Sequence, residues 1–249
     1  MPQSGGAAKV VRLMHTLRKE AQNSSAPALY GYKNPQDINR PRALMHFRDY
    51  FPKTKLVIGV RHPVWWFQSF YNYRIKRGGQ LAPPETLVGT CGPENLDVCT
   101  DNANFHANLA TFGLTSRSSA REKQLLATKQ QARRAMKPAL PNPIFLYDLS
   151  QLDAGRDARV AETLRQDLSM YLGLHTPLPP LVQTHQPPSD AQFSICEPAY
   201  QALRLELIRI GQAAGSWIEE FFLNQPTVHV SSRDEFERLI GDWAKDPCE

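Results

Sequence analysis

A short apolar run in the first third of the chain is followed by residues with a helical period. Residues 56–60, Leu-Val-Ile-Gly-Val, are apolar and partly β-branched, and a proline follows soon after, which is typical of a buried strand. Beyond Pro63, aromatic residues recur at steps of three and four, which is the period of a helix. The pattern predicts a strand, a sharp turn and a helix, with Arg61 at the carboxyl end of the strand, where open α/β sheets bind ligands.

The same kind of pattern predicts the remaining elements. A second strand is expected over residues 143–147, and a helix over 155–172 ends at Gly173, which is a proper stop signal. A long helix is expected from residue 197 to about 223. The shorter elements expected are helices at 7–20, 41–50 and 105–112, a solvated basic helix at 117–136, a strand at 28–32, an extended piece at 228–230, and a last helix that a Ser232–Glu235 capping box starts and that ends near Lys245.

Strands that alternate with helices indicate an α/β fold. We find no internal repeat and no linker that would divide the chain, so a single domain over residues 1–249 is expected. Within it, residues 77–136 form a loop-rich and helical insertion, and residues 189–249 form a helical C-terminal part. A long insertion beside a candidate site is often a lid or an acceptor-binding loop, and it is equally compatible with an idle surface excursion.

Composition and net charge say little about which ligands the chain binds. The chain has 249 residues, 41% of them hydrophobic and 21% charged, with a net charge of +5. A mildly basic protein suits anionic ligands, although a small charge spread along the chain says little. No Lys/Arg block predicts nucleic-acid binding, and no apolar run reaches the length of a membrane span. The N-terminal residues also lack the pattern of a signal peptide.

Four cysteines allow two natural pairs. Cys91 and Cys99 bracket a loop rich in Gly, Pro, Asn and Asp, while Cys196 precedes the long helix and Cys248 lies near the end of the chain. Disulfides 91–99 and 196–248 would indicate an oxidising compartment. The alternative is four free thiols. No spacing predicts a zinc site, so no metal is expected.

Residues 61–69 contain Arg-x-Pro and a serine eight residues after the arginine, between an apolar strand and an aromatic helix. This arrangement resembles the 3′-phosphate motif of sulfotransferases that use PAPS (3′-phosphoadenosine 5′-phosphosulfate). The resemblance implies a P-loop NTPase-like parallel sheet flanked by helices, with Arg61 and Ser69 as ligands of the 3′-phosphate. An arginine fork and a hydroxyl suit that anion. The alternative is a buried strand–helix junction in which Arg61 forms a structural ion pair and Ser69 is merely small.

Two further stretches resemble the same family. Lys33-Asn34-Pro35 follows the predicted strand at 28–32 and is similar to the Lys-x-Pro of carbohydrate sulfotransferases. There the resemblance implies that Lys33 neutralises charge growing on the bridging oxygen as the leaving group departs, whereas the alternative is an exposed loop lysine. Residues 143–175 resemble the family more loosely, and we interpret Tyr147 and Leu149 as core residues. The resemblance also implies a carbohydrate acceptor and residence in the Golgi or secretory lumen.

Two parts of such a site are not found in the sequence. No Gly-rich phosphosulfate loop with a Lys-x-Gly-Thr type of sequence is found, since Gly5-Gly6 has neither a lysine nor a preceding strand. No general base is identified either, because Glu20 is the only acidic residue before Lys33 and its surroundings differ. We therefore expect a sulfotransferase fold that is incomplete at its N-terminus, or else a degenerate homologue. The rival hypotheses are a P-loop kinase, whose GxxxxGK[ST] loop is also not found, and a non-catalytic nucleotide-binding or scaffold protein.

Overall fold

The computed structural model describes most of the second unit of a chain that divides into two compact units, Met1–Gln36 and Asp37–Glu249. The described residues are 41–92, 95–104, 140–180 and 193–249, together with His15, Lys19, Gly31 and Lys33. In the first unit, His15 and Lys19 are helical and Gly31 is not in a strand. The rest of the elements predicted at 7–20 and 28–32, and those predicted at 105–112 and 117–136, lie outside the described residues.

Within the described part of the chain, three strands form one parallel sheet in the order β1 (Leu56–Val60), β2 (Ile144–Asp148) and β3 (Val228–Val230). The register between β1 and β2 runs from Leu56 opposite Ile144 to Val60 opposite Asp148. Parallel neighbours need long crossover connections, and helices lie between the strands in the sequence. The predicted α/β class is therefore confirmed. The extended piece at 228–230 is the third strand of this sheet, which its sequence did not indicate.

The helices match the predicted ones closely. A glycine in the left-handed region, Gly173 at φ 77°, ends the helix after β2, as the sequence predicted. The α-helices are α2 (Pro41–Tyr50), α3 (Pro63–Lys76), α7 (Ala158–Leu172), α8 (Gln201–Trp217) and α9 (Arg233–Gly241). A π-helical turn (Ile218–Phe222) continues α8, and short 3-10 helices cover Pro84–Thr86, Thr100–Ala103, Leu149–Leu152, Pro198–Tyr200 and Asp242–Ala244.

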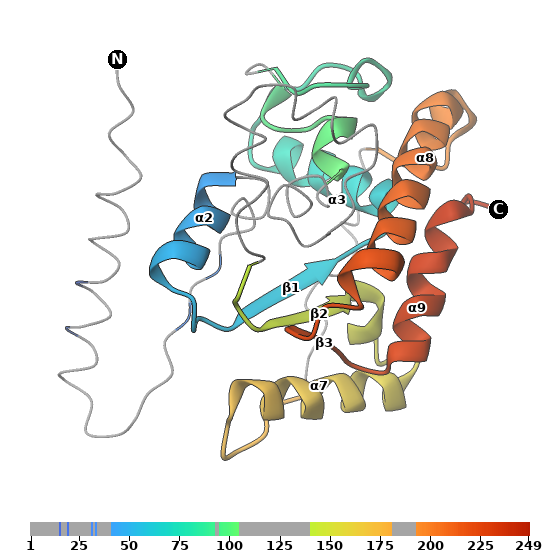
Figure 1. The fold of residues 1–249 in the computed structure, drawn as a ribbon. Coiled ribbons are helices and arrows are strands. Elements are labelled where there is room, and N and C mark those ends of the chain that lie inside the picture. The colour runs from blue at the N-terminus through green and yellow to red at the C-terminus, as the bar shows by residue number, and fades with distance from the viewer. Residues whose placement is uncertain are drawn as a thin grey trace. The chain divides into compact units, whose positions relative to one another are not determined.

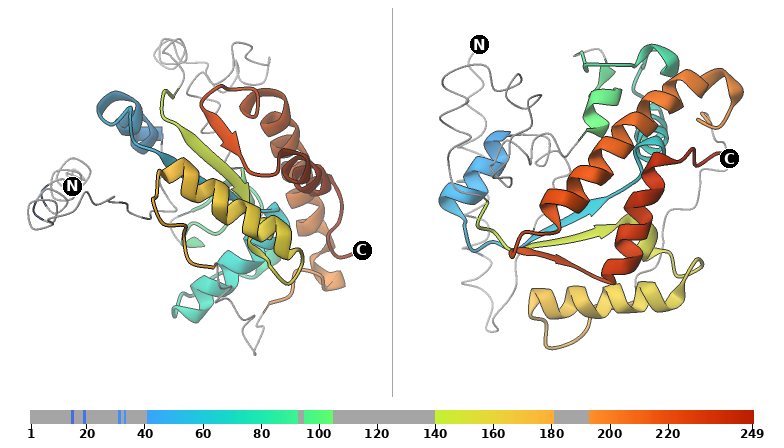
Figure 2. Two further views of the ribbon diagram at one scale, coloured as in Figure 1. Left: turned by 90° about the horizontal axis from the view of Figure 1, so that it is seen from below. Right: turned by 45° about the vertical axis from the view of Figure 1, so that its right-hand side comes forward.

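Helices cover the sheet on both sides, as Figure 1 shows. Seen from below in Figure 2, α7 crosses the strands on the near side. On that side the ring of Phe145 in β2 lies 5.3 Å from the ring of Tyr171 in α7. On the other side Ile144 and Leu146 are fully buried against residues of α2, α8 and α9. The members of this core cluster from the helices include Leu44, Ala214, Trp217, Phe222, Phe236, Ile240 and Trp243.

A second core cluster attaches α3 to the rest of the molecule. Val64 and Phe67 on α3 are fully buried together with Leu207 of α8. The described start of the predicted insertion, residues 77–104, adds Leu87 and Val98 to this cluster. Because α3 packs against α8, the segment that follows β1 is held along a long element of the C-terminal part.

Both predicted disulfides are present. Cys91 pairs with Cys99, and Cys196 pairs with Cys248, with Cα atoms 5.2 Å and 5.4 Å apart. The first closes a short loop, and the second ties the chain end to the segment before α8. Two disulfides are consistent with an oxidising or extracellular compartment.

The predicted capping box at the start of α9 is wrong. Ser232 precedes this helix but adopts a left-handed conformation with φ 47°, and its side chain makes no capping hydrogen bond. An N-cap residue normally has an extended backbone, which directs its hydroxyl at the free N–H groups of the first turn. The partner expected for it, Glu235, instead pairs with Arg238 at 2.6 Å.

Among the described residues, the structure has no helix that is both long enough and apolar enough to cross a membrane.

We expect the two disulfides to contribute unequally to stability. A cross-link restricts the unfolded chain more when it closes a longer loop, and the two pairs are 52 and 8 residues apart. The loop-closure relation gives about 4 kcal/mol for Cys196–Cys248 and about 2.5 kcal/mol for Cys91–Cys99. Urea unfolding of the variants Cys196→Ser/Cys248→Ser and Cys91→Ser/Cys99→Ser should show the larger loss in the first. A larger loss in the second would contradict this account.

Candidate functional site

Arg61 lies where the sequence predicted, directly after the last residue of β1. Val60 is opposite Asp148 in the register, so the carboxyl ends of β1 and β2 meet at one edge of the sheet. The Arg61 side chain is half-buried, and in the part of the chain that the structure describes no hydrogen bond or ion pair engages its guanidinium group. Burial lowers the pKa of Arg61, and the attraction of the Asp148 carboxylate opposes that effect. An arginine remains protonated even so. The edge therefore presents a partly desolvated cation whose donors are open to an anion.

Asp148 is a site residue that the sequence reasoning missed. The residue is 1% exposed, and its carboxylate accepts hydrogen bonds from the backbone N–H and the hydroxyl of Ser150. The side chain of Trp243 also bonds to it. Burial raises the pKa of Asp148, while these bonds lower it. A polar residue after the apolar run Ile-Phe-Leu-Tyr was the signal that could have identified it.

His62 begins α3 and orders its first turn. Its Nδ1 atom accepts a hydrogen bond of 3.1 Å from the backbone N–H of Val64, and Pro63 occupies the first helical position. An accepting Nδ1 carries no proton, so the neutral ring carries its proton on Nε2. Burial lowers the pKa of His62, and this effect is opposed by the carbonyl groups of Lys245 and Asp242 and by nearby carboxylates. His62, in the turn after β1, thus interacts both with the first turn of α3 and with residues near the C-terminal end of the chain.

Ser69 is exposed on α3, about two turns after His62. Among the described residues, no hydrogen bond engages its hydroxyl group, which leaves the group able to bind a ligand. Ser69 and Arg61 belong to one strand–turn–helix unit, whose orientation Gln68 helps to fix by accepting a hydrogen bond of 2.8 Å from the backbone N–H of Ile195. Binding of the 3′-phosphate by Arg61 and Ser69 stays a prediction.

Lys33 belongs to the first unit, where its side chain is exposed. The structure therefore brings Arg61 together with Asp148 and His62, and the catalytic role predicted for Lys33 stays a prediction.

Two residues expected in the core differ from that expectation. Leu149 is 39% exposed, because it follows the end of β2 and starts a 3-10 helix instead of continuing the strand. Tyr147 is only half-buried, and its ring lies over β1 at Gly59. A Cβ atom at Gly59 would be 2.8 Å from the Tyr147 ring, so the ring in its present position requires glycine there.

The pKa of His62 predicts how stability depends on pH. The folded state lowers this pKa below the ordinary value of 6.5, so the unfolded chain binds more protons in that range, and stability falls as the pH drops below about 6.5. In the His62→Asn variant, the amide oxygen can accept the Val64 N–H without titrating. Urea unfolding at about pH 7.5 and about pH 5.5 should therefore show a smaller acid loss for the variant than for the unmodified protein. Equal losses would exclude His62 as the cause.

Searches against models of protein families, against curated proteins and against solved structures found no match to this chain.

Proposed function

We propose that this chain is a sulfotransferase-like protein that binds PAPS and transfers its sulfuryl group to a hydroxyl or amine of a carbohydrate acceptor. The observation that supports this most directly is Arg61. It is a half-buried cation at the carboxyl end of a parallel strand, and the described part of the chain offers it no hydrogen-bonding or ion-pairing partner. Burial of a charge without a partner costs free energy, and an anionic ligand removes that cost by supplying the partner. The resemblance of residues 61–69 to the 3′-phosphate motif suggests that this anion is the 3′-phosphate of PAPS.

In this proposal the residues have distinct roles. The guanidinium of Arg61 donates two parallel hydrogen bonds to the 3′-phosphate, and the Ser69 hydroxyl donates one more. The Asp148 carboxyl group attracts the guanidinium of Arg61 from the neighbouring strand end. Lys33 neutralises the charge that develops on the bridging oxygen of the departing nucleotide. No metal ion takes part, and the two disulfides agree with the Golgi or secretory lumen as the compartment.

The second candidate is a non-catalytic protein that binds the nucleotide or serves as a scaffold. The observation in its favour is that no phosphosulfate loop and no general base are recognised in the sequence. The half of the site formed by Arg61 and Ser69 would then bind a 3′-phosphate without turnover. Both candidates share the same anion, so binding of the nucleotide is the first property to test.

We predict that the unmodified chain binds PAP, the desulfated product of PAPS, and that Arg61→Ala weakens this binding about 10- to 100-fold. The factor corresponds to the loss of hydrogen bonds to a charged group, about 1.5–3 kcal/mol. Calorimetry measures the affinity, and a PAP-dependent rise in the melting temperature gives a second readout.

The matched control for this test is Arg209→Ala. Arg209 is an exposed arginine on α8 that pairs with Glu206, so its loss removes the same charge away from the edge of the sheet. PAP affinity should be unchanged in the control. Stabilisation by ATP but not by PAP would favour a different nucleotide role, and no response to either ligand would overturn the proposal.

A further inference from the structure

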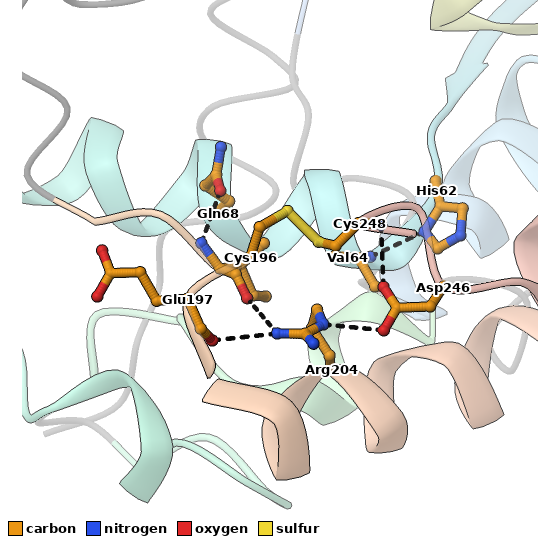
Figure 3. Close-up of a disulfide and its surroundings, with 9 residues drawn as sticks. His62, Val64, Gln68, Cys196, Glu197, Arg204, Asp246 and Cys248 are labelled. Carbon is orange, nitrogen blue, oxygen red and sulfur yellow. Dashed lines mark hydrogen bonds and ion pairs between the residues drawn. A yellow bond between two sulfur atoms is a disulfide. The ribbon is translucent and has the colours of Figure 1, made fainter. Parts of the chain in front are cut away.

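The C-terminal residues 242–248, which we call the clasp, lie against the turn that carries Arg61. The backbone carbonyls of Asp242 and Lys245 face the ring of His62, the residue next to Arg61. The ring of Trp243 lies 6.4 Å from the same imidazole. Figure 3 shows His62 beside Asp246 and the chain end. The clasp therefore contacts the neighbour of Arg61 in the sequence.

The clasp also reaches the neighbour of Arg61 across the sheet. Trp243 is almost fully buried, and its side chain is hydrogen-bonded to the carboxylate of Asp148. That carboxylate is the charge that attracts the Arg61 guanidinium. Arg61 is thus flanked by two residues, His62 and Asp148, and the same C-terminal segment holds both of them.

Two strong links fasten the clasp to the start of α8, and both appear in Figure 3. The first is the disulfide between Cys248 and Cys196. The second is the ion pair between Asp246 and Arg204, at 3.0 Å. Arg204 is only 8% exposed, and it also donates to the carbonyls of Ile195 and Glu197 at 2.9 Å and 3.1 Å. Removing one partner of a buried ion pair leaves the other charge buried without compensation, so this link is costly to break.

The clasp also packs closely against α8 at Gly211. A Cβ atom at Gly211 would lie 2.7 Å from the backbone oxygen of Trp243 and 3.3 Å from Cδ of Pro63. Glycine at this position therefore allows α8 to contact the clasp and the first turn of α3 at the same point. Clasp, α8 and the Arg61 turn form one packed unit.

We propose that the clasp is a positioning device for Arg61: the Cys196–Cys248 disulfide and the Arg204–Asp246 pair hold the clasp, which holds His62 and Asp148 in place for anion binding. The identity of the anion rests on the proposed function, whereas the contacts do not. The competing account is that the disulfide only adds stability and has no effect on the site.

The first test compares two disulfide variants with each other. Cys196→Ser/Cys248→Ser releases the clasp, and Cys91→Ser/Cys99→Ser removes a disulfide outside it. Calorimetry with PAP, at a temperature at which circular dichroism shows each variant folded, should give affinity about tenfold weaker for the first variant. The second variant should bind PAP as the unmodified protein does. Equal affinities in both variants would overturn the proposal.

The second test does not need a nucleotide. NMR titration of His62 should show its pKa rising toward 6.5 in the Cys196→Ser/Cys248→Ser variant, because a released clasp no longer buries the ring. No change of the pKa in the released variant would overturn the proposal, and absence of PAP binding with this shift intact would count only against the proposed function.

Discussion

The parallel pairing of β1 with β2 is the constraint on which the candidate site depends, because it brings residues from distant parts of the sequence to one edge. The register sets Val60 opposite Asp148, so the residue that follows β1, Arg61, emerges beside a buried carboxylate. Parallel strands cannot be joined by a tight turn, and each connection therefore leaves and returns through a helix. The residues that follow the strands at the carboxyl edge therefore lie outside the sheet, where they can bind a ligand. Gly59 and Tyr147 show how close this pairing is, since the ring of one strand lies on the backbone of the other.

The polar groups around this edge differ from Arg61 in one respect. Asp148 and Arg204 are buried, and hydrogen-bond partners in the described structure offset their loss of water, whereas in His62 only Nδ1 has such a partner and Nε2 has none among the described residues. They are best understood as scaffold, because their bonds fix backbone segments at the start of α3, after β2 and before α8. Arg61 is the half-buried charge of this group whose donors remain open within the described residues. Function is expected where a group lacks partners in a site that otherwise supplies them.

The C-terminal part of the chain contributes to the rigidity of the Arg61 turn. The chain continues past α9 and returns to the Arg61 turn, where the ring of Trp243 lies 6.4 Å from the ring of His62. The disulfide to Cys196 and the ion pair to Arg204 hold that return against α8. Rigidity near a ligand reduces the entropy lost on binding, so residues far from the ligand can affect affinity.

Much of the fold was determined by local sequence. The periods of apolar residues, the proline after Arg61 and the glycine after α7 predicted β1, β2, α2, α3, α7 and α8, because these signals act within one element. The cysteine spacing also suggested both disulfides. The site was predictable only in part: Arg61 was found from its place after an apolar run, whereas Asp148 and the clasp were not. The conformation of Ser232 was missed for a related reason, since a left-handed residue depends on its surroundings and not on a capping pattern. Tertiary structure alone decided that a three-residue strand joins the sheet and that Trp243, His62 and Asp148 meet beside Arg61, because long-range packing brings together residues whose separation in the sequence carries no local signal.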